Sequence, residues 1–300
     1  MKRTILFWVN VLQDAVSVWL ARNAFSYAGS LAFYTLFSLA PTMIIAVTVI
    51  GVVMGPEAAQ GQIVTQLQDT LGPEVAKAIE QAVAQSRIEQ AGILPTLLGI
   101  GTLLIGATTV FAQMQFSLNT IWGVTAKPTT NSLLIFIKNR LLSLTVVLSI
   151  GFTLLVSLVL GVVVSAMLHA ANYLFPYAAL LTQGVEALVS LAVVTLLFAT
   201  IFKVLPDVIL RWKDVLIGAI VTAVLFTLGR SVIALYLTYT ATASTYGAAG
   251  SVVMILLWVY YSSLILLFGA AFTRALLLRR GHSLLPRNTA VLVKRELVQH

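Results

Sequence analysis

Apolar residues dominate this chain in long stretches that short polar segments separate. Six of these stretches approach or exceed the roughly 20 residues with which a helix crosses the hydrocarbon core of a bilayer. They run from about Ser30 to Met54, Ile93 to Phe111, Leu141 to Leu168, Ala178 to Phe202, Val215 to Tyr239 and Ala248 to Leu278. Backbone groups in lipid must be satisfied within their own segment, and the short alternating segments of a barrel do not occur. The pattern predicts an all-α fold, a polytopic membrane helix bundle with six transmembrane helices.

The composition agrees with this pattern. Hydrophobic residues make up 59% of the 300 positions and charged residues only 9%, against about 25% charged residues in soluble domains. We therefore expect one membrane domain over residues 1–300, and we exclude a soluble enzyme and a disordered chain. The absence of cysteine also excludes disulfides and thiolate chemistry.

Residues 1–25 precede the first predicted span and have a different pattern. Lys2 and Arg3 are followed by an apolar run, which a narrow polar stripe interrupts at helical spacing. The stripe consists of Asn10, Gln13, Asp14 and Ser17. This pattern predicts an interfacial helix that lies on the cytoplasmic leaflet. A helix packed on the bundle is the alternative.

Residues 55–92 form a sizeable segment between the first two spans. Apolar residues recur every four positions on both sides of Gly72-Pro73, a pair that ends one helix and begins another. They are Ile63, Leu67 and Leu71, then Val75, Ile79 and Val83. We expect a short pair of extracytoplasmic amphipathic helices. It serves as a structural cap over the bundle or as a functional lid.

The distribution of basic residues predicts the orientation. Fifteen of the 18 lysine and arginine residues fall in the termini and in alternate loops, and such loops are cytoplasmic. Both termini are therefore expected in the cytoplasm, with residues 279–300 as a cytoplasmic tail. Because the charges follow topology and do not form one basic face with interleaved aromatic residues, we expect no nucleic-acid partner.

Candidate chemistry is sparse. Catalysis needs a nucleophile with its base, paired carboxylates or a metal cluster. The three histidines, His169, His282 and His300, have no partners at ligand spacing, and no catalytic motif is present. We expect no catalytic residues, no metal site, no cofactor and no enzymatic activity.

Uncharged polar residues inside the predicted spans are more informative, because lipid makes them costly. In the first span a polar stripe shares its face with Pro41, which is expected to kink the helix near Phe37–Pro41. The second span carries polar positions on two stripes, and the sixth carries two adjacent tyrosines in mid-membrane. The candidate cavity residues are Tyr27, Ser30, Tyr34, Ser38, Pro41, Thr102, Thr109, Gln113, Asn119, Tyr260 and Tyr261. They hydrogen-bond between helices or line a polar cavity for an amphipathic molecule.

Two full charges lie deep in the predicted spans, Glu186 in the fourth and Arg230 in the fifth. Each lies about 12 or 13 Å from the same outer surface if its helix is straight. Since neighbouring spans joined by a short loop usually pack together, we expect an intramembrane ion pair. The alternative is that Arg230 extends outward and that water reaches Glu186 from the outer surface.

Three stretches of the chain resemble a known family. Ala28–Pro41, Phe111–Val124 and Tyr246–Ala275 are similar to segments of the YihY/BrkB family of bacterial inner-membrane proteins, once labelled ribonuclease BN. The resemblance covers about residues 20–280 and implies six spans in the inner membrane. The family commonly has glutamate where this chain has Ala271, so a role that needs that carboxylate is not expected here.

Three functions are weighed on this basis. The first is a transporter or permease-like protein for an amphipathic substrate such as a lipid or envelope component. The second is a structural or scaffolding membrane protein without transport. The third, a membrane-bound ribonuclease, is disfavoured because the residues offer no constellation for phosphodiester cleavage. Membrane lipids are the expected partners.

Overall fold

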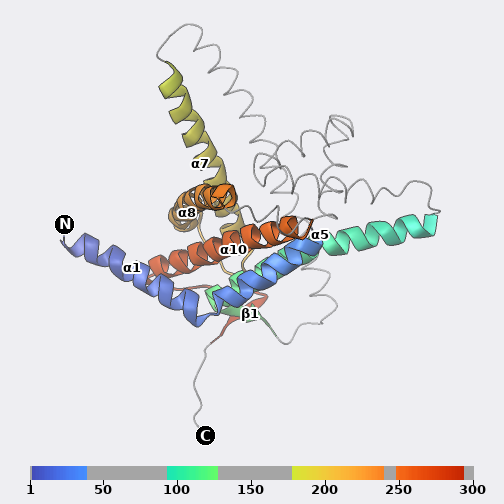
Figure 1. Ribbon diagram of the computed structural model, residues 1–300. Coiled ribbons are helices and arrows are strands. Elements are labelled where there is room, and N and C mark those ends of the chain that lie inside the picture. The colour runs from blue at the N-terminus through green and yellow to red at the C-terminus, as the bar shows by residue number, and fades with distance from the viewer. Residues whose placement is uncertain (1, 39–92, 128–177, 240–247, 294–300) are drawn as a thin grey trace. The chain divides into compact units, whose positions relative to one another are not determined.

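The computed structural model describes residues 2–38, 93–127, 178–239 and 248–293 (Figure 1). These residues are mostly helical, as the sequence predicts. The helices are α1 (Lys2–Ala21), a helix over residues 24–38, α5 (Ile93–Trp122), α7 (Ala178–Val204), α8 (Trp212–Tyr239) and α10 (Ala248–Arg279). Two short strands, β1 (Val124–Ala126) and β2 (Ala290–Leu292), pair antiparallel with Val124 opposite Leu292. The hydrophobic pattern of the sequence does not predict this small sheet.

Four helical segments within the described residues are long and apolar enough to cross a membrane. They are Thr4–Ala21, Ala187–Val204, Trp212–Ile233 and Ile255–Arg279. The last three coincide with the predicted fourth, fifth and sixth spans. The third predicted span, most of the first and the segment 55–92 lie outside the described residues, so the six-span topology stays a prediction.

The chain divides into two compact units, which we describe separately. Unit 1 comprises residues 1–24, 115–231 and 265–300, and unit 2 comprises residues 25–114 and 232–264. Unit 1 contains α1, α7, the small sheet and parts of α5, α8 and α10. The prediction of one membrane domain is not tested by this division.

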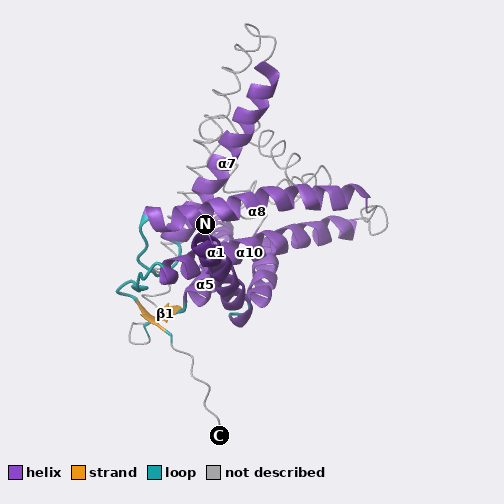
Figure 2. Ribbon diagram, turned by 90° about the vertical axis from the view of Figure 1, so that its left-hand side faces the viewer, coloured by secondary structure: helices purple, strands orange, loops and turns teal. Residues whose placement is uncertain are grey.

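The core of unit 1 depends on two glycines that let α8 and α10 approach closely. A Cβ atom on Gly218 of α8 would overlap the hydroxyl of Thr273 in α10, and one on Gly269 would overlap the hydroxyl of Thr222. The arrangement is reciprocal, so the two helices run antiparallel and side by side here (Figure 2). Small residues allow such close packing of membrane helices.

Both threonines at this crossing are completely buried. The Thr222 hydroxyl donates to the Gly218 carbonyl (2.6 Å), and the Thr273 hydroxyl donates to the Gly269 carbonyl (2.7 Å). Each hydroxyl is thus satisfied within its own helix, and its oxygen is also the atom nearest to the opposite glycine. The ring of Phe202 from α7 also reaches Gly269, so three helices meet at this point.

Helix α1 packs against unit 1 through one of its faces. Val11 and Ala15 are fully buried in a cluster with Phe272, Ala275 and Leu276 of α10. These contacts between α1 and α10 agree with the second possibility that the sequence allows, a helix packed on the bundle.

Aromatic and charged residues reinforce the packing of α1. Trp8 stacks on Phe272 with ring centroids 6.4 Å apart, and the Asp14 carboxylate accepts a hydrogen bond from Arg279. Large apolar side chains on the opposite face of α1 are exposed. They include Ile5, Leu6, Val9, Leu12, Val16 and Leu20. Because α1 is also long and apolar enough to cross, its interfacial placement stays a prediction.

Replacing Ala15 with leucine is expected to displace α1 from α10. Ala15 has no exposed surface, and extra methylene groups in a packed core typically cost about 1–3 kcal/mol. Thermal unfolding of the purified protein in detergent measures this loss. Val16→Leu is the matched control, because Val16 is exposed. Equal unfolding temperatures for the two variants would contradict the packing of α1.

Candidate functional site

Unit 1 contains a polar junction where α5 meets the loop between α7 and α8. Asp207 in this loop accepts hydrogen bonds through its carboxylate from Asn119 Nδ2 (2.7 Å) and Gln115 Nε2 (3.3 Å) of α5. The backbone N–H of Asp207 donates to Asn119 Oδ1 (2.8 Å). Asn119 is only 9% exposed, and both the oxygen and the nitrogen of its side-chain amide bond to Asp207. This contact fastens the loop to α5.

The C-terminal segment holds the other side of the same loop. Ile209 N–H donates to the Leu285 carbonyl (2.8 Å), and Arg287 N–H donates to the Asp207 carbonyl (2.9 Å). The Arg287 guanidinium also reaches the Val204 carbonyl (3.0 Å) at the end of α7, where a cation is favoured by the helix dipole. Residues 285–293, which the sequence predicts only as a tail, are thus part of unit 1.

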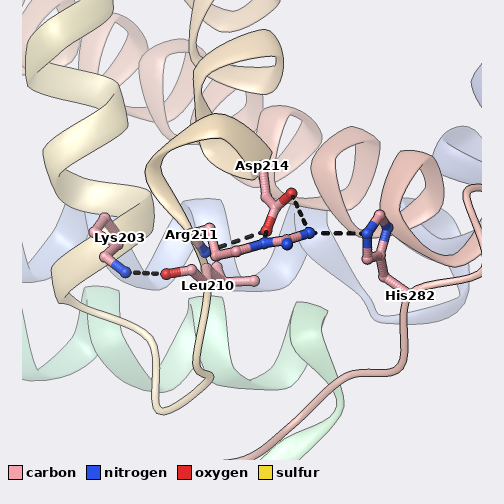
Figure 3. Close-up of polar contacts among 5 residues, drawn as sticks. All are labelled: Lys203, Leu210, Arg211, Asp214 and His282. Atoms are coloured by element: carbon pink, nitrogen blue, oxygen red, sulfur yellow. Dashed lines mark hydrogen bonds and ion pairs between the residues drawn. The ribbon is translucent and has the colours of Figure 1, made fainter.

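The start of α8 carries a charged cluster (Figure 3). Arg211 precedes the helix, and its backbone N–H and Nε both donate to the Asp214 carboxylate (3.2 and 3.0 Å). A carboxylate at this position caps the first turn. The hydrogen bond with Asp214 raises the pKa of Arg211. Arg211 Nη2 donates to His282 Nε2 (2.8 Å), and Lys203 donates to the Leu210 carbonyl.

His282 reaches this cluster because α10 ends in a glycine cap. Gly281 has φ +77°, a value that glycine adopts without strain. The N–H of His282 donates to the Leu277 carbonyl (3.1 Å), and that of Gly281 donates to the Leu278 carbonyl (3.0 Å). This pair of bonds is a Schellman motif. Gly281 was the sequence signal that could have placed His282 at this end of unit 1.

Two arginines approach each other in unit 1. Arg22 follows α1, Arg274 lies in the last two turns of α10, and both side chains are partly buried. The two guanidinium groups are close enough to interact electrostatically. The Arg22 guanidinium covers Gly123, where an added Cβ would lie 3.0 Å from Arg22 Nη2. Neither the sequence stripes nor the charge pattern predicted this pairing of like charges.

The candidate cavity residues of unit 2 are mostly not buried. Tyr34 is 37% exposed, and only Ser38 is buried. The remaining described side chains are partly exposed: Tyr27, Ser30, Thr109, Gln113, Tyr260 and Tyr261. The hydroxyl of Ser38 donates to the Thr35 carbonyl (3.2 Å) and that of Thr109 to the Ile105 carbonyl (2.6 Å). These two hydroxyls therefore bond within their own helices.

The other candidate residues fall elsewhere. Asn119 belongs to unit 1, where Asp207 engages it. Pro41, with its predicted kink, and the side chains of Thr102 and Glu186 lie outside what the structure describes. Arg230 is exposed on α8. In the described part of the chain no group of three histidine, cysteine or acidic residues could hold a metal ion.

The ion pair of Glu186 and Arg230 stays a prediction, which charge reversal tests. Glu186→Arg or Arg230→Glu alone is expected to lower the yield of folded protein, because each leaves two like charges in a costly environment. The double swap is expected to restore the yield. Size-exclusion chromatography in detergent measures it. Equal yields for all three variants would show that the charges do not pair.

Comparison with known proteins gives consistent matches to one group. The model of the family described as virulence factor BrkB matches residues 15–291. A UPF0761 membrane protein of Aeromonas salmonicida is 30% identical over 83% of this chain and 82% of its own length. A second, from Alteromonas mediterranea, is 28% identical over 90% of this chain and 91% of its own length. No solved structure matches the chain.

Proposed function

This chain belongs to the BrkB family of membrane proteins, and on that premise we propose that it is a transporter or permease-like protein for an amphipathic substrate. The substrate class is a lipid or another envelope component with a polar head and an apolar body. The proposed location is the bacterial inner membrane, with both termini in the cytoplasm.

The observation that carries this proposal is the exposure of the polar residues in unit 2. Polar side chains that only pack between helices are expected to be buried, as Thr222 and Thr273 are in unit 1. Tyr34, Tyr260 and Tyr261 instead keep part of their surface open. A tyrosine offers an apolar ring and a hydroxyl together, so it suits a substrate that is itself both polar and apolar.

The lack of full charge among these residues supports the same substrate class. Pathways for small ions are marked by charged side chains within the spans. The uncharged hydroxyl and amide groups of tyrosine, serine, threonine and glutamine can donate hydrogen bonds to phosphate or glycerol oxygens. An amphipathic molecule therefore suits these residues better than a small bare ion does.

A scaffolding function is the second candidate, and the network of unit 1 favours it. Asn119 was predicted as a cavity residue, but its side-chain amide forms hydrogen bonds with Asp207 and so holds the α7–α8 loop. If the residues of unit 2 have similar roles, the protein organises other membrane components without moving a substrate. Ribonuclease activity finds no support among the described residues, which hold no metal-binding cluster.

Removing tyrosine hydroxyls separates transport from scaffolding. The double variant Tyr34→Phe/Tyr260→Phe keeps both rings and is expected to slow lipid movement in proteoliposomes about 5- to 20-fold, since a hydrogen bond is worth about 1 kcal/mol. Thr200→Val is the control, because the Thr200 hydroxyl bonds the Leu196 carbonyl of its own helix. Unchanged movement in the double variant would contradict a role for the tyrosine hydroxyls.

A further inference from the structure

The loop between α7 and α8 forms a short two-stranded ribbon with the C-terminal segment of unit 1. Val208 pairs antiparallel with Pro286, and the N–H of Ile209 donates to the Leu285 carbonyl (2.8 Å). Side chains of an extended chain alternate between its two faces. Val208 and Leu210 are accordingly buried, whereas Ile209 is 58% exposed and Leu285, directly opposite it, is 56% exposed. The ribbon therefore presents an apolar pair on its outer face.

Trp212 adds a third large apolar side chain close to this pair. It is the first residue of α8 and lies three positions after Ile209. Its side chain is 51% exposed. We call Ile209, Trp212 and Leu285 the exposed apolar patch. Large apolar side chains that gather on a surface mark a contact with another molecule or with a membrane.

The exposed apolar patch has a cation within it. Arg211 lies between Ile209 and Trp212 in the chain, and its side chain donates to the Asp214 carboxylate (3.0 Å) and to His282 Nε2 (2.8 Å) (Figure 3). The bond to His282 brings the residues that follow α10 to the start of α8. The patch is thus built from both sides of unit 1 that meet at this place.

The exposed charge beside the patch is positive on balance. The Asp214 carboxylate is paired with Arg211. Lys213, in the first turn of α8, and Arg280, two residues before His282, are both exposed and add positive charge. Apolar side chains flanked by cations are complementary to an anionic lipid, which combines a negative headgroup with apolar chains.

The position of the patch favours a lipid over a soluble acidic protein. The candidate span Trp212–Ile233 begins at the patch, and the candidate span Ile255–Arg279 ends three residues before His282. Because α8 and α10 run antiparallel, these two ends coincide. If the segments cross the bilayer, the patch lies at the membrane surface, where tryptophan is enriched. On the predicted topology this is the cytoplasmic leaflet, which contains anionic lipids.

We propose that Ile209, Trp212 and Leu285 insert among the headgroups of anionic phospholipids, and that Lys213 and Arg280 bind the phosphate groups of these lipids. The apolar side chains reach the boundary between headgroups and acyl chains, as those of interfacial helices do. The surface belongs to unit 1 and shares no residue with the tyrosines of unit 2, so it does not rest on the proposed transport.

A single fluorescent label on the full-length protein tests the contact, because the chain has no cysteine. Leu285→Cys places the label on the patch, and Asn288→Cys places it on an exposed polar residue of the same segment. Both proteins are reconstituted in nanodiscs, and acrylamide, a neutral quencher in the water, measures how exposed each label is. In phosphatidylglycerol the label at Leu285→Cys is expected to lose most of the quenching that it shows in phosphatidylcholine. The label at Asn288→Cys is expected to change little.

Charge variants test whether the anionic headgroup is recognised. The share of phosphatidylglycerol in phosphatidylcholine nanodiscs is raised stepwise. Adding Lys213→Gln/Arg280→Gln to Leu285→Cys is expected to demand at least about fivefold more phosphatidylglycerol for the same protection, because each basic residue at an anionic surface strengthens binding by about that factor. Lys213→Arg/Arg280→Lys keeps both charges and is the matched control, which is expected to behave like Leu285→Cys alone.

Two results would overturn the proposal. If acrylamide quenches the label at Leu285→Cys as strongly as the label at Asn288→Cys in phosphatidylglycerol, the patch faces water, and a soluble protein is the better occupant. If protection is equal in the two lipids, or is unchanged without the charges of Lys213 and Arg280, the patch does not recognise anionic headgroups. Ile209→Cys takes the place of Leu285→Cys if that protein does not fold.

Discussion

Replacing Gly269 with alanine is expected to destabilise unit 1 by about 2–3 kcal/mol, the upper range for overpacking a close-packed interior. The new methyl group would overlap the Thr222 hydroxyl and lie 2.9 Å from the Phe202 ring. The neighbours have little freedom to move, because Thr222 and Phe202 are both completely buried. The variant is therefore expected to show a lower unfolding temperature and a smaller yield of monodisperse protein in detergent.

Gly184→Ala is the matched control for this prediction. Gly184 lies in α7 and is exposed, and an added Cβ atom would have no neighbour within 4 Å. Alanine favours the helix over glycine by up to about 1 kcal/mol, so this control is expected to be neutral or slightly stabilising. If Gly269→Ala were as stable as Gly184→Ala, the close crossing of α8 and α10 would be wrong.

A second substitution at the crossing separates steric overlap from helix propensity. In Thr222→Ala the hydroxyl that meets the added methyl group is absent. The double variant Gly269→Ala/Thr222→Ala is therefore expected to regain part of the stability that Gly269→Ala loses. Additive losses in the double variant would show that the two residues do not touch.

Replacing Asn119 with alanine is expected to cost about 2–4 kcal/mol. The substitution removes a hydrogen bond to the Asp207 carboxylate and leaves the Asp207 N–H without its acceptor. Bonds to charged groups contribute about 1.5–3 kcal/mol, and a partly buried donor left unpaired adds to the loss. Limited proteolysis is expected to cut the α7–α8 loop faster in this variant than in the wild type.

Thr120→Ala is the control at the next position of α5. The Thr120 hydroxyl donates to the Phe116 carbonyl of its own helix (3.0 Å), and alanine is an equal or better helix former. Little change is expected in unfolding temperature or in cleavage. An Asn119→Ala protein that resists proteolysis as well as Thr120→Ala would show that the amide does not hold the loop.

Most of the helical structure could be predicted because it depends on local chain properties. Long apolar stretches require helices in lipid, and the described helices α5, α7, α8 and α10 cover their predicted ranges. The strands β1 and β2 were missed because three residues are too few to show an alternating pattern. The apolar run of Ala290–Leu292 becomes a strand only because Val124–Ala126 lies beside it.

The polar contacts were harder to predict because their partners are distant in sequence. Asn119 looked like a stripe residue, and its partner Asp207 lies 88 residues away in a loop. Gly269 is one of several small residues in the spans that allow helices to approach closely, but the sequence does not show that Gly269 and Gly218 each lie opposite a threonine. The proximity of Arg22 and Arg274 follows from how α1 packs on α10, which the sequence left open between two alternatives.

Lipid movement across the bilayer by the reconstituted protein tests the proposed function most directly. Purified wild-type protein is placed in liposomes that contain a fluorescent phospholipid, and dithionite quenches the label in the outer leaflet. The account predicts that proteoliposomes lose far more than the half of the fluorescence that empty liposomes lose, because lipid from the inner leaflet reaches the outside. A loss of only half, with protein shown to be folded and inserted, would contradict transport of lipid.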